Sequence, residues 1–146
     1  MAEFRHYPSM GKDNQPTKLT VASGPVIIEK NKVLLDKHGE DEFWKFPGGA
    51  HKDDHSFRKN AQEEARQELG LEIELVKEDP FIVTFERVSN GVLEYVILVH
   101  YLAKRINEEI KPRRDVREYA WHPIYDLPKD CAPNIKPAID YFASRL

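Results

Sequence analysis

The chain has 146 residues, of which 40% are hydrophobic and 32% are charged, and its formal net charge at pH 7 is −3. This length suits one domain with a single core, and the composition excludes a disordered tail or a membrane protein. The longest apolar run, 92–103, is interrupted by Glu94 and His100 and is shorter than the roughly 20 residues of a bilayer span. The negative charge argues against a nucleic-acid polymer as ligand, and without a continuous apolar signal segment we expect a cytoplasmic protein.

The N-terminal third predicts an irregular arm followed by a pair of strands. Residues 1–18 are rich in turn-forming residues and lack periodicity, so we assign them to the arm and the single domain to 19–146. Two apolar segments, 21–28 and 33–35, flank a polar stretch, which is typical of strands joined by a tight turn. The Phe-Pro-Gly-Gly segment at 46–49 should end the extended stretch that begins at residue 43.

Residues 57–69 predict a helix. Ser56 can cap its N-terminus, and Gly70 stands where a left-handed residue commonly ends a helix. At about 100° per residue, one stripe of the helix faces the core and carries Phe57, Ala61, Ala65 and Leu69.

Two acids of this helix lie at or within the core-facing stripe. Glu68 falls inside it and Glu64 at its edge, whereas Glu63, Arg66 and Gln67 fall on the solvated or flanking surface. An ionised glutamate that faces the core is costly unless it is paired or binds a cation. Two acids one turn apart also repel each other, and an oxygen-rich pair suits Mg²⁺ or Mn²⁺. Pairing of Glu68 with an arginine is the alternative.

The remaining chain predicts four more strands and a closing helix. Apolar patterns indicate strands at 71–76, 81–88, 92–103 and 118–122, and the Asn-Gly pair at 90–91 favours a hairpin turn between the second and third of these. Residues 134–146 carry apolar residues at helical spacing, namely Ile135, Ala138, Ile139 and Phe142. This mixed order of strands and helices predicts an α/β domain with a mixed sheet.

Residues 49–71 match a known motif at fixed spacing. The motif is Gly-x5-Glu-x7-Arg-Glu-U-x-Glu-Glu-x-Gly-U, where U is apolar, and its matched positions are Gly49, Glu64, Ala65, Glu68, Gly70 and Leu71. This is the Nudix box, and over roughly residues 19–146 the chain resembles the Nudix hydrolase superfamily. The resemblance implies an α/β/α sandwich with a mixed β-sheet. It also implies that Gly49, Glu64 and Glu68 hold Mg²⁺ or Mn²⁺.

Three positions depart from the box. His55 replaces the loop glutamate, Glu63 replaces the arginine, and Gln67 replaces the first of the paired acids. In the family the loop glutamate and the arginine help to hold the loop and helix together, and the loss of an acid at Gln67 should weaken metal binding. We interpret the polar residues of the preceding loop as solvated rather than as a transition-metal site, namely His51, Asp53, Asp54 and His55.

The resemblance implies hydrolysis of a phosphoanhydride bond in a nucleoside diphosphate linked to another group, with the metal neutralising phosphate charge. A base outside the box often activates water, and Glu118 is our candidate, with Asp115, Glu108 and Glu109 as alternatives. Arg87 is a candidate to meet phosphate, and Phe85 and Trp44 are candidates to stack a base. Further candidates for these two roles are Phe43, Phe81, Tyr95, Arg113 and Arg114.

Two other functions remain open. The altered box positions are consistent with a noncatalytic Nudix-fold module for nucleotide binding or interaction. A purely structural domain is the third reading, but it leaves the carboxylates at the core edge unexplained. No sequence marker chooses among nucleotide sugars, dinucleoside polyphosphates, oxidised nucleotides and capped RNA ends, and a homodimer is left open.

Overall fold

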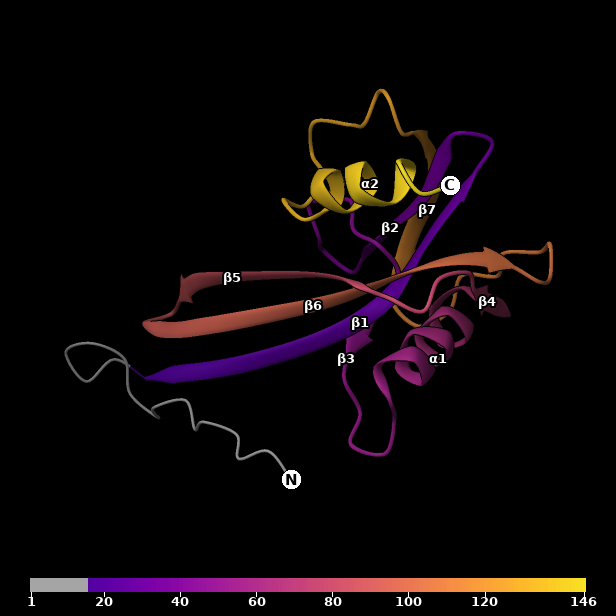
Figure 1. Cartoon of the computed structure of the whole chain (residues 1–146). Helices are drawn as coiled ribbons and strands as arrows, with labels where there is room; N and C mark the ends of the chain where they lie inside the picture. The colour runs from indigo at the N-terminus through magenta and orange to yellow at the C-terminus, as the bar shows by residue number, and fades with distance from the viewer. Residues whose placement is uncertain (1–15) are drawn as a thin grey trace.

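A long first strand organises the fold of residues 16–146, the part of the chain that this computed structural model describes (Figure 1). Strand β1, Thr17–Glu29, runs parallel to β6, Val92–Arg105, in a continuous ladder from Thr17↔Leu93 to Ile27↔Ala103. The predicted arm lies outside the described residues except for 16–18, and β1 starts two residues before the expected beginning of the domain.

The sheet grows from β1 and β6 in both directions. Strand β2, Lys32–His38, pairs antiparallel with β1, and β7, Val116–Pro123, pairs antiparallel with β2. On the other side, β4, Ile73–Leu75, and β5, Phe81–Ser89, each pair antiparallel with β6. The short β3, Gly49–Ala50, pairs with β1 near its middle. The result is a seven-stranded mixed sheet, which confirms the predicted class.

Both predicted tight turns are present. Lys30 and Asn31 between β1 and β2 have φ of 51° and 61°, and Asn90 and Gly91 between β5 and β6 have φ of 53° and 77°. Two successive residues with positive φ give the hairpin turn whose twist matches that of the strands, and asparagine and glycine adopt it at low cost.

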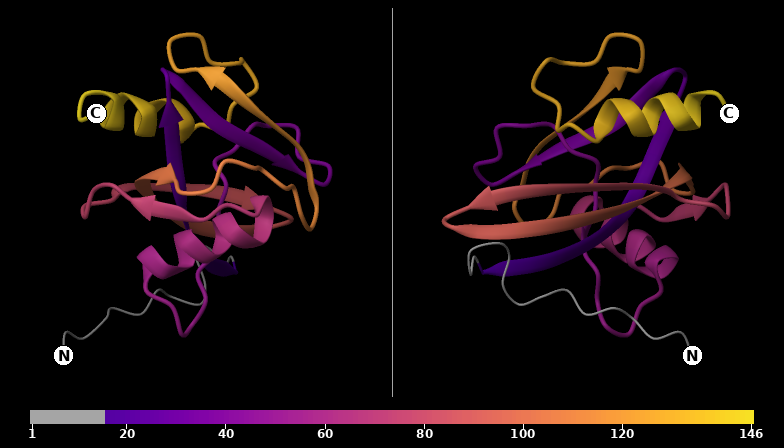
Figure 2. Two further views of the ribbon diagram at one scale, coloured as in Figure 1. Left: turned by 90° about the vertical axis from the view of Figure 1, so that its right-hand side faces the viewer. Right: turned by 60° about the vertical axis from the view of Figure 1, so that its left-hand side comes forward.

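Two helices cover opposite faces of the sheet, as the views in Figures 1 and 2 show: α1, Phe57–Leu69, and α2, Ile135–Ala143. Alternate residues of one strand serve the two faces, since Val26 packs in the core beneath α2 and Ile27 in the core beneath α1. This arrangement confirms the α/β/α sandwich. Within the described residues, none of the helices is long and apolar enough to cross a membrane.

Helix α1 begins and ends as predicted. The Ser56 side chain accepts a hydrogen bond from the Lys59 N–H, and Gly70 is left-handed with φ of 64°. Ala61, Ala65 and Leu69 are fully buried. The prediction for Phe57 is wrong: its side chain is 38% exposed and its ring lies 4.6 Å from that of His51, because the first helical turn extends beyond the edge of the core.

Candidate metal centre on helix α1

The segment before β3 lies unusually close to β1. A Cβ atom at Gly24 would lie 2.0 Å from the Pro47 carbonyl oxygen, and one at Gly48 would lie 2.8 Å from the Ser23 carbonyl oxygen. Only glycine permits this approach. It brings the Gly48 N–H to within 3.1 Å of Glu68 Oε2, and it sets Gly49 against Glu64, where a Cβ would lie 2.6 Å from Oε2.

A buried amide ties this segment to the helix. Asn60 Nδ2 donates to Ser23 Oγ at 2.8 Å and to the Gly49 carbonyl oxygen at 3.2 Å, while Ser23 Oγ donates to the Phe57 carbonyl oxygen at 3.2 Å. Glu63, at the arginine position of the box, instead pairs with Arg66 at 2.5 Å. The chain thus holds loop to helix through Ser23 and Asn60, a connection that sequence reasoning missed.

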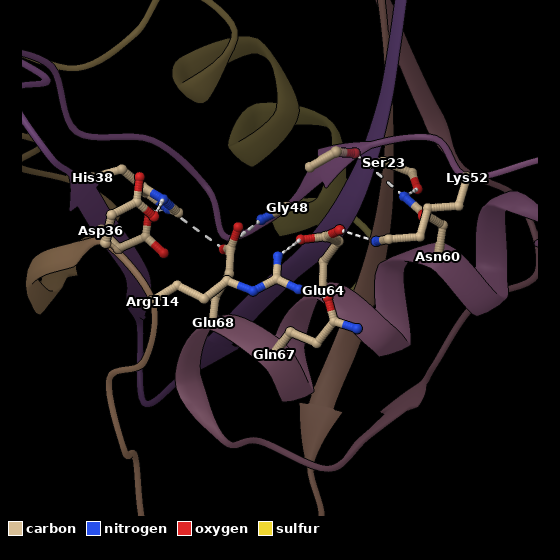
Figure 3. A network of polar contacts seen from close by, with 12 residues as sticks. Ser23, Asp36, His38, Gly48, Lys52, Asn60, Glu64, Gln67, Glu68 and Arg114 are labelled. Atoms are coloured by element: carbon tan, nitrogen blue, oxygen red, sulfur yellow. Dashed lines mark hydrogen bonds and ion pairs between the residues drawn. The ribbon is translucent and has the colours of Figure 1, made fainter.

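Glu64 is 3% exposed and is surrounded by cations. Lys52 Nζ lies 2.5 Å from Glu64 Oε1, and an Arg114 guanidinium nitrogen lies 3.9 Å from Oε2 (Figure 3). Arg114 also donates a hydrogen bond to the side-chain oxygen of Gln67. A negative charge at this depth requires cationic partners, and the chain supplies two of them.

Glu68 is 4% exposed and lies on the same side of α1, one turn further along. Its Oε2 accepts from the Gly48 N–H and lies 3.4 Å from His38 Nε2. Burial raises the pKa of Glu68 to about 7, although His38 and the Gly48 N–H act in the opposite direction. The predicted burial of both glutamates is therefore confirmed.

Strand β2 adds two residues that the sequence analysis did not select. Asp36 is fully buried, and His38 Nε2 lies 3.2 Å from Asp36 Oδ1. The Asp36 and Glu68 carboxylates raise the pKa of His38 to about 11, whereas burial raises the pKa of Asp36. The signal in the sequence was an acid that continues the buried run 33–35, with a histidine two positions later on the same face.

The loop before β7 is anchored on the C-terminal end of α1. The Lys111 and Arg113 N–H groups donate to the carbonyl oxygens of Leu69 at 2.8 Å and Glu68 at 2.7 Å. Arg114 adopts φ of 54°, which is uncommon for a residue with a side chain. This docking directs Arg114 towards Glu64 and places Asp115 Oδ1 3.4 Å from His38 Nδ1.

Glu118 does not reach this site. It lies opposite Lys37 in the β2–β7 ladder, and Lys37 Nζ lies 4.8 Å above the Trp44 ring in the core beneath α2. Because opposite residues of antiparallel strands point to the same face, Glu118 faces away from Glu68. The structure does not support its selection as the base; Asp115 is the alternative that contacts the cluster.

The three candidate substrate residues also lie elsewhere. Trp44 is 8% exposed and packs edge-on against His122, so it has no open face for a base. Arg87 pairs with Glu94 at 2.5 Å near the β5–β6 turn, with Phe85 beside it. Glu94 is in register with Lys18 of β1, roughly 16 Å along the strand from the Ser23 level. The structure therefore does not bring these residues to the carboxylates.

A surface cavity of about 770 Å³ lies beside the site rather than over it. It is bordered by the C-terminal end of α1 and by the loop that follows β6, and both signs of charge line it, including Arg66, Glu72, Glu108 and Arg113. Arg66 is held between Glu63 and Glu72. We place the candidate site at Glu64 and Glu68 rather than in this cavity, because these two acids are buried and a buried negative charge is costly without a cation.

The donor set around α1 suits a divalent cation. Glu64 and Glu68 offer carboxylate oxygens from one face of the helix, and the Gly49 carbonyl oxygen faces the same loop–helix junction. Hard cations prefer oxygen ligands of this kind. Lys52 and Arg114 lie beside Glu64, which indicates that this position favours a cation.

A family model and solved structures match this chain. The family model of the NUDIX domain matches residues 18–142. No curated protein sequence matches the chain significantly. Among solved structures, a MutT Nudix hydrolase from Burkholderia pseudomallei is similar with a TM-score of 0.71 and 23% identity, covering 84% of this chain and 97% of that chain.

Two further structures are similar at comparable coverage. An ADP-ribose pyrophosphatase from Streptococcus suis has a TM-score of 0.61 and 21% identity, over 87% of this chain and 92% of that one. An Ap4A hydrolase from C. elegans, solved as a binary complex, has a TM-score of 0.64 and 19% identity, over 86% and 96%. At these identities the likeness establishes a shared fold.

Proposed function

This chain belongs to the Nudix family, and we propose that it is a pyrophosphohydrolase that cleaves a phosphoanhydride bond in a nucleoside diphosphate linked to another group. One observation carries the proposal: Glu64 and Glu68, in register with the box, are both buried side by side against the Gly48–Gly49 loop. Two buried negative charges side by side are costly, and a bound cation would offset that cost. The names of the two neighbours that act on ADP-ribose and Ap4A support the substrate class.

Glu64, Glu68 and the Gly49 carbonyl would hold Mg²⁺ or Mn²⁺, as the resemblance implies. When bound, the ion neutralises phosphate charge and lowers the pKa of water. Lys52 has a long, partly exposed side chain, so it can leave Glu64 and turn towards a phosphate oxygen. Arg114 stands at the same edge and offers a second cation to the substrate.

Asp115 replaces Glu118 as our candidate base. Its side chain is 70% exposed, so substrate and water can approach it, while its contact with His38 keeps it next to the carboxylates. In hydrolysis, water adds to one phosphorus atom, the bridging P–O bond breaks, and the base takes the proton of the water. The bridging oxygen leaves as part of the departing phosphate group.

A noncatalytic nucleotide-binding module is the second candidate. One observation favours it, because Lys52 and Arg114 already balance the charge of Glu64. If these pairs persist in solution, nucleotide phosphates would meet cationic side chains without a metal.

Product analysis with ADP-ribose, Ap4A and nucleotide sugars, in Mg²⁺ or Mn²⁺, tests the proposal. We expect metal-dependent cleavage by the wild type, and a loss of about 100-fold or more in kcat for Glu64→Gln, which removes a charged oxygen. Glu63→Gln is the matched control, because Glu63 lies on the same helix and pairs with Arg66 instead. Its activity should stay within about threefold, since that exposed pair contributes little.

Melting curves with each nucleotide complete the test. Stabilisation by nucleotide without cleavage would establish the binding module instead. If nucleotides neither are cleaved nor stabilise the protein, the purely structural reading is correct.

A further inference from the structure

The three ligand atoms of Asp36, His38 and Glu68 converge on one point at the end of β2. His38 Nε2 lies 3.2 Å from Asp36 Oδ1 and 3.4 Å from Glu68 Oε2, and all three atoms lie within 4.8 Å of one another. Figure 3 shows Asp36 and His38 beside Glu68 at one end of this row of side chains, and Lys52 beside Glu64 at the other end. The cluster is thus separate from the cations around Glu64.

These separations fit ligands of a common metal ion. Two ligand atoms that each lie about 2.1 Å from a metal are roughly 3.0 Å apart in octahedral geometry and about 3.4 Å apart in tetrahedral geometry. The two contacts of His38 Nε2 fall on or between these values. The third separation, between the Asp36 and Glu68 oxygens, is within 4.8 Å, and rotation of these two carboxylates would set it.

Asp36 supplies an independent reason. Its side chain is completely buried, and within the described residues neither of its oxygens accepts a hydrogen bond. His38 Nε2 lies 3.2 Å from Asp36 Oδ1, which is close enough for an ion pair, but the two atoms do not form a hydrogen bond. Buried carboxylates normally have hydrogen-bond partners or bind a cation, because removing their charge from water is costly. Asp36 Oδ1 lies at the cluster, beside His38 Nε2, and is available to a metal.

The other nitrogen of His38 also has the environment of a metal ligand. Nδ1 lies 3.4 Å from Asp115 Oδ1, on the loop anchored to the end of α1. In metal sites, a histidine that binds through one ring nitrogen commonly donates its other N–H to a carboxylate, which fixes the ring orientation. Asp115 is positioned to orient His38 in this way.

We propose that Asp36, His38 and Glu68 form a binding site for a borderline divalent ion, of which Zn²⁺ is the representative. One imidazole nitrogen and two carboxylate oxygens favour such an ion over Mg²⁺, and three protein ligands leave a position for water or a substrate oxygen. The site shares Glu68 with the proposed hydrolase centre, but its occupancy does not require turnover and involves neither Glu64 nor Gly49.

Titration of metal-free, untagged protein with Zn²⁺, Co²⁺ and Mg²⁺ tests the site. We expect one Zn²⁺ or Co²⁺ per chain, with an affinity at least about tenfold higher than that for Mg²⁺. His38→Gln and Asp36→Asn should each weaken Zn²⁺ binding by at least about tenfold. His55→Gln, a histidine of the box outside the cluster, is the matched control and should bind Zn²⁺ like the wild type.

The Co²⁺ protein provides a readout that needs no substitution. Coordination by His38 Nε2 should give a paramagnetically shifted imidazole N–H resonance that exchanges with solvent. Its absence at saturating Co²⁺, or wild-type Zn²⁺ affinity in a folded His38→Gln variant, would overturn the proposal and leave a protonated histidine between two acids as the correct description.

The same variants separate this proposal from the proposed function. Glu64→Gln should retain Zn²⁺ and Co²⁺ binding while it loses hydrolysis. If hydrolysis responds to Glu64→Gln but Zn²⁺ binding does not respond to His38→Gln, the hydrolase assignment stands and the second site is rejected. If Zn²⁺ binding depends on His38 but no substrate is cleaved, the metal site stands and the hydrolase assignment falls.

Discussion

At Gln67 the chain has an amide where the Nudix box has a carboxylate. The amide oxygen accepts a hydrogen bond from Arg114, whose guanidinium also approaches Glu64. Arg114 can therefore serve both side chains, because only one of them is charged. The arrangement gives the edge of the candidate centre one anion fewer than the box prescribes.

Gln67→Glu should strengthen metal binding. A second carboxylate next to Glu64 would leave one of the two negative charges unbalanced by Arg114, so we expect the Mn²⁺ dissociation constant to fall about three- to tenfold. Calorimetry with Gln62→Glu as a charge-matched control measures this. Unchanged affinity at Gln67 would place that position outside the coordination region.

For single residues, the sequence predicted the features that follow from the periodicity of one helix. The burial of Glu64 and Glu68 follows from their angles on one helix. Asp36 and His38 were missed because only the packing of α1 against β2 brings them to Glu68. Glu118 was selected as an acid outside the box. Nothing local in the sequence reveals its register opposite Lys37, which decides the face of the sheet it occupies.

Among the elements, the close contact between β1 and the loop before β3 controls the geometry of the site. Gly24→Ala would place a methyl group against the backbone of Pro47 and Gly48, which cannot move aside without shifting the loop. We expect a loss of about 1–3 kcal/mol in the free energy of unfolding, together with weaker metal binding, because the Gly48 N–H would move away from Glu68. Urea unfolding and calorimetry measure both effects.

Gly91→Ala provides the comparison for Gly24. A Cβ there meets no atom within 4 Å, but its φ of 77° disfavours a side chain. We expect a cost of about 1 kcal/mol and unchanged metal binding, since the turn is remote from α1. Equal effects of both variants on metal affinity would contradict the role assigned to the loop contact.

The sequence predicted individual helices and turns better than it predicted the contacts between these elements. Helix α1 has the predicted bounds, and both hairpin turns were identified from short polar segments. The end of β2 was missed, because Asp36 and His38 interrupt the apolar pattern that marked 33–35 as a strand. Pairing with β7 extends that strand regardless of its polarity.

For the whole molecule, His100 should make stability sensitive to acid. It lies in β6 beneath α2, with its ring 4.9 Å from that of Phe46. The Asn134 side-chain amide nitrogen lies 3.1 Å from His100 Nε2 and donates a hydrogen bond to it when the ring is neutral. Burial lowers the pKa of His100 to about 4. The unfolded chain therefore takes up this proton at a higher pH than the folded chain does.

The stability that neutral His100 contributes is present above pH 6.5 and is lost as the pH falls towards 4. Between pH 6.5 and pH 5 we expect a loss of about 1.5 kcal/mol from this residue alone. His100→Gln cannot titrate and should remove that part of the pH dependence, whatever its effect on stability at pH 7. Urea unfolding at several pH values measures it, and parallel curves for the two proteins would show that His100 is not the source.

The pairing of β1 with β6 has a consequence for how the molecule folds. The Arg105–Glu29 ion pair joins the ends of these neighbouring strands although the residues are 76 positions apart in the sequence. The central ladder consequently closes a very long loop, and the entropy of that closure is lost before most native contacts form. Helix α1 lies within this loop, and the core beneath it includes Ile27 of β1 and Ala103 of β6, so that core is complete only once the ladder has closed. We therefore expect the candidate metal centre to form late in folding, together with the core beneath α1.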